Sequence, residues 1–392
     1  MVHPSNDIRG MKSKKLEGKI IILAVTGSIA AVETIKLARE LIRNGAKVVP
    51  VMSESACKII HPHALEFATG EKPITELSGK VEHILYCGER EKRADLLLIA
   101  PCTANTISKI ALGIDDTSVT TFATTAVGSK MPIVVVPVMH SSMYDNPFVV
   151  DNIGKCMEEG ITIVEPRMEE GKAKIAENDE IVETVIQILG KNDFRGKNIL
   201  VIGGATSEFI DDVRVITNLS SGKMVLALAK IAYERGGNVE IWYSRLSPPA
   251  YVKSEEFVNH EDIVRLIKKG KKFDYVINCA AISDFTAEKK KGKIRSGKEI
   301  DLHFFPVQRI NPLLRKIGKT LVGFKLEADE KNIVDSAFER MNNDGMDYIV
   351  TNTASAIGSD YMKAWIIDKE KNIVEIKGKK EVIAEKIFDC IL

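Results

Sequence analysis

The feature that most constrains this fold is a pattern that occurs twice along the chain. An uninterrupted apolar run ends in glycine, a helical pattern follows, and a second glycine precedes another apolar run. Continuous apolar runs that alternate with helices indicate parallel strands buried on both faces. The sequence therefore predicts an α/β fold with two doubly wound, Rossmann-like units. In the first half the apolar runs are 19–27 and 47–52 around a helix at 30–43, and in the second half they are 197–204 and 238–243 around a helix at 221–235.

Further strands and a boundary complete this prediction. Gly190–Gly196 is short, polar and flanked by glycines, as linkers are, and a closing helix is predicted before it at Ile181–Leu189. We place the boundary near Lys191, which gives domains at 1–190 and 191–392. A Lys/Gly-rich segment, 288–298, is expected to be a loop. Further strands are expected at 95–100, 132–137, 161–164, 273–280, 320–324, 348–351, 364–368 and 372–376.

The composition excludes several classes of partner. Among 392 residues, 55 Lys and Arg against 54 Asp and Glu give a net charge of +1, which leaves no electrostatic footprint for nucleic acid or an anionic membrane. The six cysteines contain no C-x-x-C pair, which favours a reducing compartment. No apolar run reaches membrane-spanning length, and the polar first 18 residues contain no signal core. We therefore expect a soluble, cytoplasmic protein.

Polar residues follow three strands of the first half, where open α/β sheets bind ligands. The turn Thr26–Ala31 offers glycine, a hydroxyl and helix-start amides, which suit a phosphate, although Ser28 as a simple N-cap is an equal alternative. Ala100–Lys109 places Thr103 and Asn105 at a helix start, where they cap the helix or bind a polar ring edge. Pro137–Tyr144 adds a loop with one His and two Met, and such Met residues more often belong to a core.

Together these segments resemble the homo-oligomeric flavin-containing cysteine decarboxylases. That family has a G-[GS]-I-A-A turn, a P-A-T-A-N-T turn and a P-x-M-N-x-x-M-[YW] loop. The chain has GSIAA at Gly27–Ala31, PCTANT at Pro101–Thr106 and PVMHSSMY at Pro137–Tyr144. His83 matches the catalytic histidine of the family. The resemblance extends from Lys19 to about Val164 and implies a flavodoxin-like domain.

The resemblance implies FMN as the cofactor and 4'-phosphopantothenoyl-cysteine as the substrate. An oxidised flavin accepts two electrons from the thiol-bearing carbon, which allows CO2 to leave, and then returns them. His83 would transfer the proton as a general acid–base group, and His140 would bind the carboxylate. The flavin contacts implied by the motifs are Gly27, Ser28, Ser53, Pro101, Thr103, Asn105 and Met139.

Two departures from the decarboxylase pattern concern the substrate. His140 stands where the family has the Asn that binds the carboxylate, and imidazole can also bind this group. The cysteine-containing clamp of the family is absent, and Glu165–Ala176 occupies its place. Lys172 and Lys174 are candidates for a phosphate contact or a proton donor, but a solvated charged loop is the preferred interpretation of each. The alternative to a full decarboxylase is a flavin-binding module of reduced or regulatory function.

Glycines and hydroxyls also follow the first strand of the second half. The Gly203–Glu208 turn and the Ser220–Lys223 helix start bring N–H groups, hydroxyls and a lysine together, which suits a triphosphate or an acyl phosphate. The segment is not a Walker A loop, because the first glycine is missing. Asn278–Asp284 is also similar to the N-A-A-G turn of short-chain reductases, but no Tyr-x-x-x-Lys follows it.

The longer pattern of the second half resembles the 4'-phosphopantothenate–cysteine ligases. That family has S-N-x-S-S-G-K-M, A-A-V-[AS]-D-[YF], K-I-K, N-P-D-I and V-G-F in this order. Here Arg295 replaces the second Lys of K-I-K, and Leu313 replaces the Asp of N-P-D-I. The matching segments are TNLSSGKM at 217–224, AAISDF at 280–285, KIR at 293–295, NPLL at 311–314 and VGF at 322–324.

The ligase resemblance implies a reaction in two steps with CTP, although the sequence does not separate CTP from ATP. The carboxylate of 4'-phosphopantothenate attacks CTP to give an acyl-cytidylate, and the amine of L-cysteine then displaces CMP. Asn218 would hold the acyl-cytidylate, and Lys293 would close over the developing negative charge. Mg2+ would accompany the triphosphate, with ligands that the sequence leaves unknown. The implied nucleotide contacts are Ser221, Gly222, Lys223, Ala280, Asp284, Lys293 and Phe324.

The two resemblances combine into a bifunctional enzyme of coenzyme A biosynthesis, because one reaction supplies the substrate of the other. The decarboxylases of the family form trimers with flavin at the subunit contact, and the ligases form dimers. The fusion therefore implies a homo-oligomer, for which a dodecamer satisfies both contacts. Its partners would be small molecules, with neither nucleic acid nor membrane among them.

Overall fold

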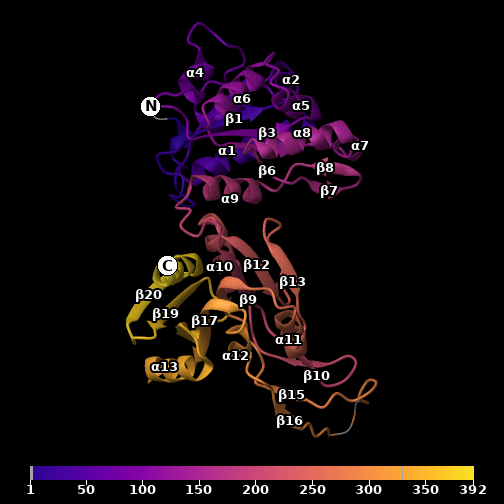
Figure 1. The fold of residues 1–392 in the computed structure, drawn as a ribbon, viewed down its shortest axis with the longest axis vertical. Helices are drawn as coiled ribbons and strands as arrows, with labels where there is room; N and C mark the ends of the chain where they lie inside the picture. The colour runs from indigo at the N-terminus through magenta and orange to yellow at the C-terminus, as the bar shows by residue number, and fades with distance from the viewer. Residues whose placement is uncertain (1–2, 296, 298, 329) are drawn as a thin grey trace. The chain divides into compact units, whose positions relative to one another are not determined.

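The computed structural model describes residues 3–295, 297, 299–328 and 330–392. Within it the chain forms two compact units, Met1–Gly190 and Lys191–Leu392. Ser296 and Lys298, which belong to the expected Lys/Gly-rich loop, lie outside the described residues. Figure 1 shows the elements of each unit.

The first unit is built on a five-stranded parallel sheet with the order β2-β1-β3-β4-β6. The strand order reverses at β1 and β3, and the carboxyl ends of these strands therefore border the crevice in which such sheets bind ligands. Most residues of β1 to β4 are buried, because helices cover both faces. The strands are β1 (Ile20–Val25), β2 (Lys47–Met52), β3 (Leu96–Cys102), β4 (Ile133–Pro137) and β6 (Thr162–Ile163).

Successive residues of each strand enter two different cores. Ile21 and Leu23 of β1 pack with α1, α3 and α9, whereas Ile22 and Ala24 pack with α4, α5, α6 and α8. In α1, Leu37, Leu41 and their neighbours form one buried stripe, as the helical period requires. The helices are α1 (Thr34–Arg43), α3 (Pro62–Thr69), α4 (Glu82–Cys87), α5 (Ala104–Ala111), α6 (Ser118–Gly128), α8 (Pro147–Glu158) and α9 (Asn178–Leu189).

The second unit contains an eight-stranded mixed sheet with the order β13-β12-β9-β14-β17-β18-β19-β20. The first six strands are parallel, and β19 and β20 add an antiparallel edge. The strands are β9 (Asn198–Gly203), β12 (Asn238–Tyr243), β13 (Lys253–Glu256), β14 (Phe273–Asn278), β17 (Gly318–Glu327), β18 (Tyr348–Thr353), β19 (Tyr361–Asp368) and β20 (Ile373–Lys379).

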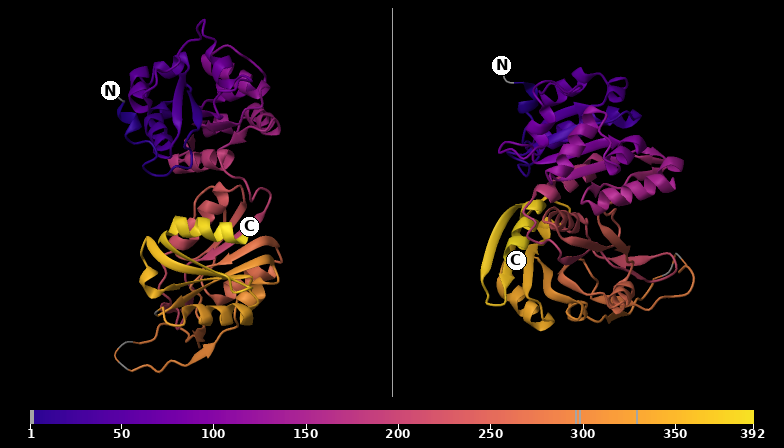
Figure 2. Two further views of the ribbon diagram at one scale, coloured as in Figure 1. Left: turned by 90° about the vertical axis from the view of Figure 1, so that its left-hand side faces the viewer. Right: turned by 45° about the horizontal axis from the view of Figure 1, so that its top comes forward.

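Helices cover both faces of this sheet as well. On one face α10 (Lys223–Glu234) and α14 (Lys380–Ile391) pack side by side, and Figure 2 shows α14 in yellow across the strands. On the other face lie α11 (His260–Lys268), α12 (Asn311–Leu314) and α13 (Ile333–Asp344). The structure therefore has the predicted α/β class, with a parallel sheet in the first unit and a mostly parallel sheet in the second.

Several short elements go beyond the predicted scheme. The predicted helix at 30–43 begins as a 3-10 turn, η2 (Ile29–Glu33), before α1. The expected charged loop at Glu165–Ala176 contains a hairpin, and its strands pair with a third segment as β5-β8-β7. The remaining short elements are β5 (Met139–His140), β7 (Arg167–Glu169), β8 (Lys172–Lys174), β10 (Ser207–Phe209), β11 (Val215–Thr217), β15 (Phe285–Ala287), β16 (Phe304–Pro306), η1 (Pro4–Asn6), η3 (Ala354–Ala356), α2 (Glu54–Cys57) and α7 (Ser141–Tyr144).

Among the described residues, no helix is both long enough and apolar enough to cross a membrane.

Candidate active sites

In the first unit, Thr26 fastens the turn after β1 to the turn after β3. Its hydroxyl donates a hydrogen bond of 2.7 Å to the carbonyl oxygen of Pro101 and accepts one of 3.1 Å from the amide of Thr103. The Ala100–Pro101 peptide bond is cis. Two of the predicted flavin contacts, Pro101 and Thr103, are thereby fixed beside Gly27 at the switch point of the sheet.

The predicted phosphate residues lie at neighbouring helix starts. The Ser28 hydroxyl accepts from the amide of Ala30 at 3.4 Å, and the Ser53 hydroxyl caps α2 by accepting from Ala56 at 3.2 Å. The amide of Ser53 donates to the carbonyl oxygen of Val25, which joins the ends of β2 and β1. Both serines act as caps here, and capping is compatible with a phosphate contact because the amides at a helix start carry partial positive charge.

Gly27 lies where the two turns approach most closely. A Cβ atom placed on it would lie 2.5 Å from Cβ of Ser55, at the start of α2. A side chain at position 27 would therefore separate the two helix starts that are proposed to face the phosphate. The glycine is required here for close approach of the backbone.

A cavity of about 630 Å³ lies beside these turns. Its lining combines Ser28 and Ile29 from η2 with Met139 and His140 from β5 and with the β7–β8 hairpin. In the antiparallel register, His140 lies directly opposite Lys172. The cavity is large enough for a flavin ring with part of a substrate, since small-molecule sites typically enclose roughly 300–1,000 Å³.

The hairpin presents several cations to this cavity, and most of them are neutralised. Arg167 forms ion pairs with Glu169 and Glu177, and Lys174 with Glu169 and Glu170. Lys172 has no ion pair with any carboxylate of the described residues. It is thus the hairpin cation with charge available to an anionic substrate group.

The ring orientation of His140 follows from its hydrogen bonds. Nδ1 accepts from the amide of Ser142 at 3.3 Å and lies 2.9 Å from the hydroxyl of the same residue. Since Nδ1 uses its lone pair, the neutral ring carries its proton on Nε2. The exposed Nε2–H is then a donor suited to a carboxylate.

Six predicted residues lie outside the described lining of the cavity. His83 belongs to α4, and its Nδ1 is buried without a hydrogen-bond partner among the described residues. Asn105 is exposed in the first turn of α5, and neither residue belongs to the described lining of the cavity. Gly27, Ser53, Pro101 and Thr103 border it only indirectly, through the turns described above.

In the second unit, glycines allow the turn after β9 to pack against α10. A Cβ atom at Gly203 would lie 2.3 Å from Cβ of Val225, and one at Gly204 would lie 2.2 Å from the carbonyl oxygen of Ser244. Gly222 has a φ of 68° and is the N-cap of α10 without a side-chain hydrogen bond. Amides at the start of α10 therefore remain available to a ligand.

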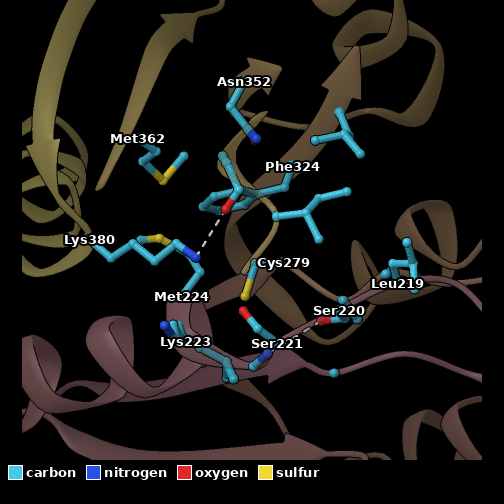
Figure 3. A pocket seen from close by; sticks show the side chains of 18 of the residues that line it. Leu219, Ser220, Ser221, Lys223, Met224, Cys279, Phe324, Asn352, Met362 and Lys380 are labelled. Atoms are coloured by element: carbon cyan, nitrogen blue, oxygen red, sulfur yellow. Dashed lines mark hydrogen bonds between the residues drawn. The ribbon is translucent and has the colours of Figure 1, made fainter. Parts of the chain in front are cut away.

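A cavity of about 160 Å³, which we call the helix-start cavity, opens at this point (Figure 3). It brings the predicted residues Ser221, Gly222 and Lys223 together with Ala280 and Phe324. Lys223 is held by Asp360 at 2.6 Å and by the carbonyl oxygen of Gly358 at 2.9 Å. The predicted phosphate segment and the predicted nucleoside-packing residue therefore share one cavity.

A larger cavity of about 560 Å³ shares Ala280 and Phe324 with the helix-start cavity. We call it the nucleotide cavity after the ligand that the sequence predicts for its lining residues. Asn218 and Asp284 also line it. Asn218 Nδ2 donates to the carbonyl oxygens of Ala281 and Ile282, both at 3.3 Å, so that the side chain is held against the turn after β14. The adjoining cavities place most of the predicted ligase residues together.

The nucleotide cavity also contains a polar cluster that the motifs did not identify. Asp344 is fully buried and accepts from Arg309 at 3.0 Å, Arg340 at 2.8 Å and Asn311 at 3.1 Å. Arg309 and Arg340 both line the cavity. Two arginines around one carboxylate leave net positive charge toward a ligand. The cluster forms only where the segment before α12, which carries Arg309, meets α13, which carries Arg340.

Lys293 belongs to the described lining of neither the helix-start cavity nor the nucleotide cavity. It lies in the segment between β15 and β16. The adjacent Ile294 is anchored, because its amide donates to Asp211 at 3.1 Å and its carbonyl oxygen accepts from Arg214. Burial alone would raise the pKa of Asp211, but backbone N–H donors from Val213, Ile294 and Arg214 together with the Arg214 guanidinium hold the pKa below its usual range. The anchor of the Lys293 segment is thus a charged, fully bonded carboxylate.

No group of three or more His, Cys, Asp or Glu residues within the described part of the chain is arranged to hold a metal ion.

Both halves of the chain match known families. Residues 9–190 match the family described as "Flavoprotein", and residues 194–392 match "DNA/pantothenate metabolism flavoprotein C-terminal domain".

Similar proteins extend along the whole chain. The "Coenzyme A biosynthesis bifunctional protein CoaBC" of Thermococcus kodakarensis is 46% identical over 400 residues, which cover 100% of this chain and 99% of the relative. A protein of the same name from Methanocaldococcus jannaschii is 42% identical over 401 residues, with 100% and 98% coverage. The crystal structure of the "DNA/Pantothenate Metabolism Flavoprotein from Streptococcus pneumoniae" is 25% identical with a TM-score of 0.45, over 50% of this chain and 98% of that one.

Proposed function

This chain belongs to the family of bifunctional coenzyme A biosynthesis proteins, and from that premise we propose how its two units divide the chemistry. The protein is an enzyme with two activities. One joins 4'-phosphopantothenate with L-cysteine, and the other is an FMN-dependent decarboxylation of the product, 4'-phosphopantothenoyl-cysteine. We assign the decarboxylation to residues 1–190 and the ligation to residues 191–392.

The observation that carries the first assignment is the cavity that joins Ser28, Met139 and His140 beside the β1 and β3 turns. The amides around Ser28 and Ser53 would hold the phosphate of FMN, and Gly27 would let its two turns approach. Pro101, Thr103 and Asn105 would face the ring, with Met139 across the cavity. FMN, when bound, supplies an acceptor for the electrons of the thiol-bearing carbon and returns them once CO2 has left.

The protein's own residues would orient the substrate and move protons. The Nε2–H of His140 would bind the cysteine carboxylate, and Lys172, opposite it, would attract the anionic end of the substrate. His83 would transfer a proton, a role for which imidazole serves as both acid and base. Because His83 lies outside the described lining of the cavity, we assign it to the flavin site of a neighbouring copy.

The second assignment rests on the adjoining helix-start and nucleotide cavities. Ser221, Gly222 and Lys223 would hold phosphates at the start of α10, while Ala280 and Phe324 would contact the nucleoside. Asn218 would hold the acyl-cytidylate, and Lys293 would close over the charge that develops at the attacked phosphate. Asp284 would contact the nucleotide from the turn after β14.

CTP and Mg2+ are further parts of this proposal. Since no metal-binding group of three or more protein ligands is present in the described residues, Mg2+ would arrive on the triphosphate. Asp284 lines the nucleotide cavity, and its carboxylate would be the protein ligand of this Mg2+.

Exposed apolar side chains support a homo-oligomer with two kinds of contact. Ile29, Met143, Phe148 and Val150 are exposed in the first unit, near the proposed flavin cavity in sequence and fold. Phe285, Phe304 and Phe305 are exposed on the β15–β16 ribbon of the second unit. Large exposed apolar side chains are available for burial in contacts between copies. We propose trimeric contacts for the first set and dimeric contacts for the second, as a dodecamer would combine them.

Separate turnover assays on the intact chain test the proposal. Ligation is followed as pyrophosphate release with CTP, 4'-phosphopantothenate and L-cysteine, and decarboxylation as CO2 release from 4'-phosphopantothenoyl-cysteine. We expect both, together with a yellow FMN chromophore. FMN binding without CO2 release would instead support the second candidate, a working ligase with a regulatory flavin module, which the absence of cysteine from Glu165–Ala176 favours. Pyrophosphate release with ATP and not CTP would correct the nucleotide.

A further inference from the structure

Lys380, the first residue of α14, is a buried lysine that the proposed reactions do not use. Only 8% of its surface is exposed. Its Nζ donates one hydrogen bond, 3.3 Å long, to the carbonyl oxygen of Ala356. An ammonium group carries three N–H donors, so its hydrogen-bonding capacity is mostly unused by the described residues.

The side chain of Lys380 ends in the helix-start cavity. Figure 3 shows it reaching toward the middle of the cavity, on the side of Met224 and Phe324, with the bond to Ala356 dashed. It reaches the start of α10 from the neighbouring helix α14, at the point where β20 ends and α14 begins.

The charges that line the helix-start cavity are unbalanced. Its described lining contains three lysines and no Asp or Glu. Lys223 is paired with Asp360 at 2.6 Å, and Lys325 with Glu327 at 2.8 Å. Among these three, Lys380 is the one for which no carboxylate of the described chain lies within 4.0 Å.

An ammonium group in this position is costly unless an anion joins it. Burial of a charge without a partner is strongly unfavourable, and proteins offset it with paired charges or bound ions. Burial and then the nearby Lys223 lower the pKa of Lys380. The uncapped start of α10 adds partial positive charge to the same cavity. The buried lysine and the start of α10 therefore both favour an anion in this cavity, where the nearby Asp360 acts on the pKa of Lys380 in the opposite direction to burial and Lys223.

We infer that Lys380 binds a phosphate oxygen of a ligand of the ligase unit. This inference rests on the proposed ligation and adds to it a binding residue from the last helix of the chain. The contact would be a charge-assisted hydrogen bond from the ammonium group of Lys380 to a phosphate oxygen. Two ligands of this reaction offer such an oxygen, the nucleotide triphosphate and the phosphate monoester of 4'-phosphopantothenate.

The experiment compares full-length wild type with Lys380→Met, titrated with CTP, pyrophosphate, 4'-phosphopantothenate and pantothenate in a calorimeter. Lys379→Met is the matched control, because Lys379 is adjacent, exposed and identical in charge. We expect Lys380→Met to weaken at least one phosphorylated ligand tenfold or more, while Lys379→Met binds like wild type. Weaker binding of CTP and pyrophosphate would identify the triphosphate as the ligand of Lys380. Weaker binding of 4'-phosphopantothenate with unchanged binding of pantothenate would identify the phosphate monoester.

Thermal unfolding separates this role from a structural one. Removal of a buried charge without a partner should leave the Tm of ligand-free Lys380→Met equal to or above that of wild type, with a smaller rise on adding ligand. A lower Tm with wild-type affinities would overturn the inference and leave the ligation intact. Wild type that binds none of the phosphorylated ligands would overturn both. If the Met variant does not fold, Lys380→Arg and Lys380→Gln give the same comparison, with binding expected only where the charge is kept.

Discussion

Single residues set how closely the ligand-facing turns approach, and Gly27 is the tightest position in the first unit. We predict that Gly27→Ala lowers the FMN content per chain and destabilises the first unit, because the new Cβ would lie 2.5 Å from Cβ of Ser55. Overpacking of this kind costs roughly 1–3 kcal/mol. The measurements are the flavin absorbance per chain and the unfolding temperature. Gly154→Ala, in α8 with open space around it, is the control, and full flavin content in Gly27→Ala would refute the prediction.

Asn218 and Lys293 are the residues on which ligation is proposed to depend. We predict that Asn218→Ala and Lys293→Gln abolish pyrophosphate release while FMN stays bound, because both residues belong to the second unit. The pair is informative because Asn218 lines the nucleotide cavity and Lys293 does not. Unchanged ligation in either variant would remove that residue from the proposed site.

Asp211 anchors the segment that carries Lys293. We predict that Asp211→Asn lowers ligation by weakening the anchor at Ile294, with FMN content unchanged. The pKa of Asp211 lies below its usual range, so its stabilisation is complete above the unfolded-state value of about 3.9 and is lost only as pH falls through the folded-state value. The pH profile of ligation should therefore show no step from Asp211 between pH 5 and pH 8. Asp212→Asn, an exposed neighbour that bonds Gly292, should have a smaller effect, and an equal loss would contradict this ranking.

At the scale of elements, Arg235 holds the end of α10 to the segment before β9 and to α14. It is almost fully buried, pairs with Asp193 and with Asp389 at 2.8 Å, and lies 5.0 Å over the Phe194 ring. We predict that Arg235→Ala destabilises the second unit by about 1–3 kcal/mol, because it removes a buried guanidinium from the Phe194 ring and from two carboxylates that are themselves partly exposed. Chemical denaturation, with the loss of ligase activity as its readout, measures the free energy of unfolding of the second unit. Arg265→Ala, which breaks an exposed pair with Asp262, should cost less than about 1 kcal/mol.

At this same scale, sequence and structure agree on the long elements and differ on the short ones. The buried runs that became β1, β3, β9 and β14 were identified because strands covered on both faces carry a strong apolar signal. The β7–β8 hairpin was expected to be a charged loop, because two strands of three residues, Arg-Met-Glu and Lys-Ala-Lys, are too short to carry such a signal. Its turn is defined by positive φ angles at Glu170 and Gly171, a conformation visible only in the backbone.

The site residues divide in the same way. Ser28, Met139 and His140, and likewise Ser221, Lys223 and Phe324, belong to local motifs and meet in the cavities described. Arg309, Arg340 and Lys380 come from separate elements and belong to none of the motifs. Their roles depend on how the segment before α12 packs against α13 and on the packing of α14, which a single sequence does not determine.

For the molecule as a whole, the division between Gly190 and Lys191 has an experimental consequence. Each unit has its own pair of cores, one on each face of its sheet. We predict that chains 1–190 and 191–392, expressed separately, both fold, that the first binds FMN and that the second releases pyrophosphate. Circular dichroism and the two assays measure this, with an equimolar mixture as the control. Ligation that appears only in the mixture would show that the second unit depends on the first.

The β5-β8-β7 ribbon that borders the flavin cavity is held by main-chain pairing, which does not depend on the identity of its side chains. Lys172 can therefore be exchanged without loss of the wall that carries it. This makes the position a convenient one for engineering. A small library at this single codon would retune the preference of the enzyme for differently charged thiols while the scaffold stays the same.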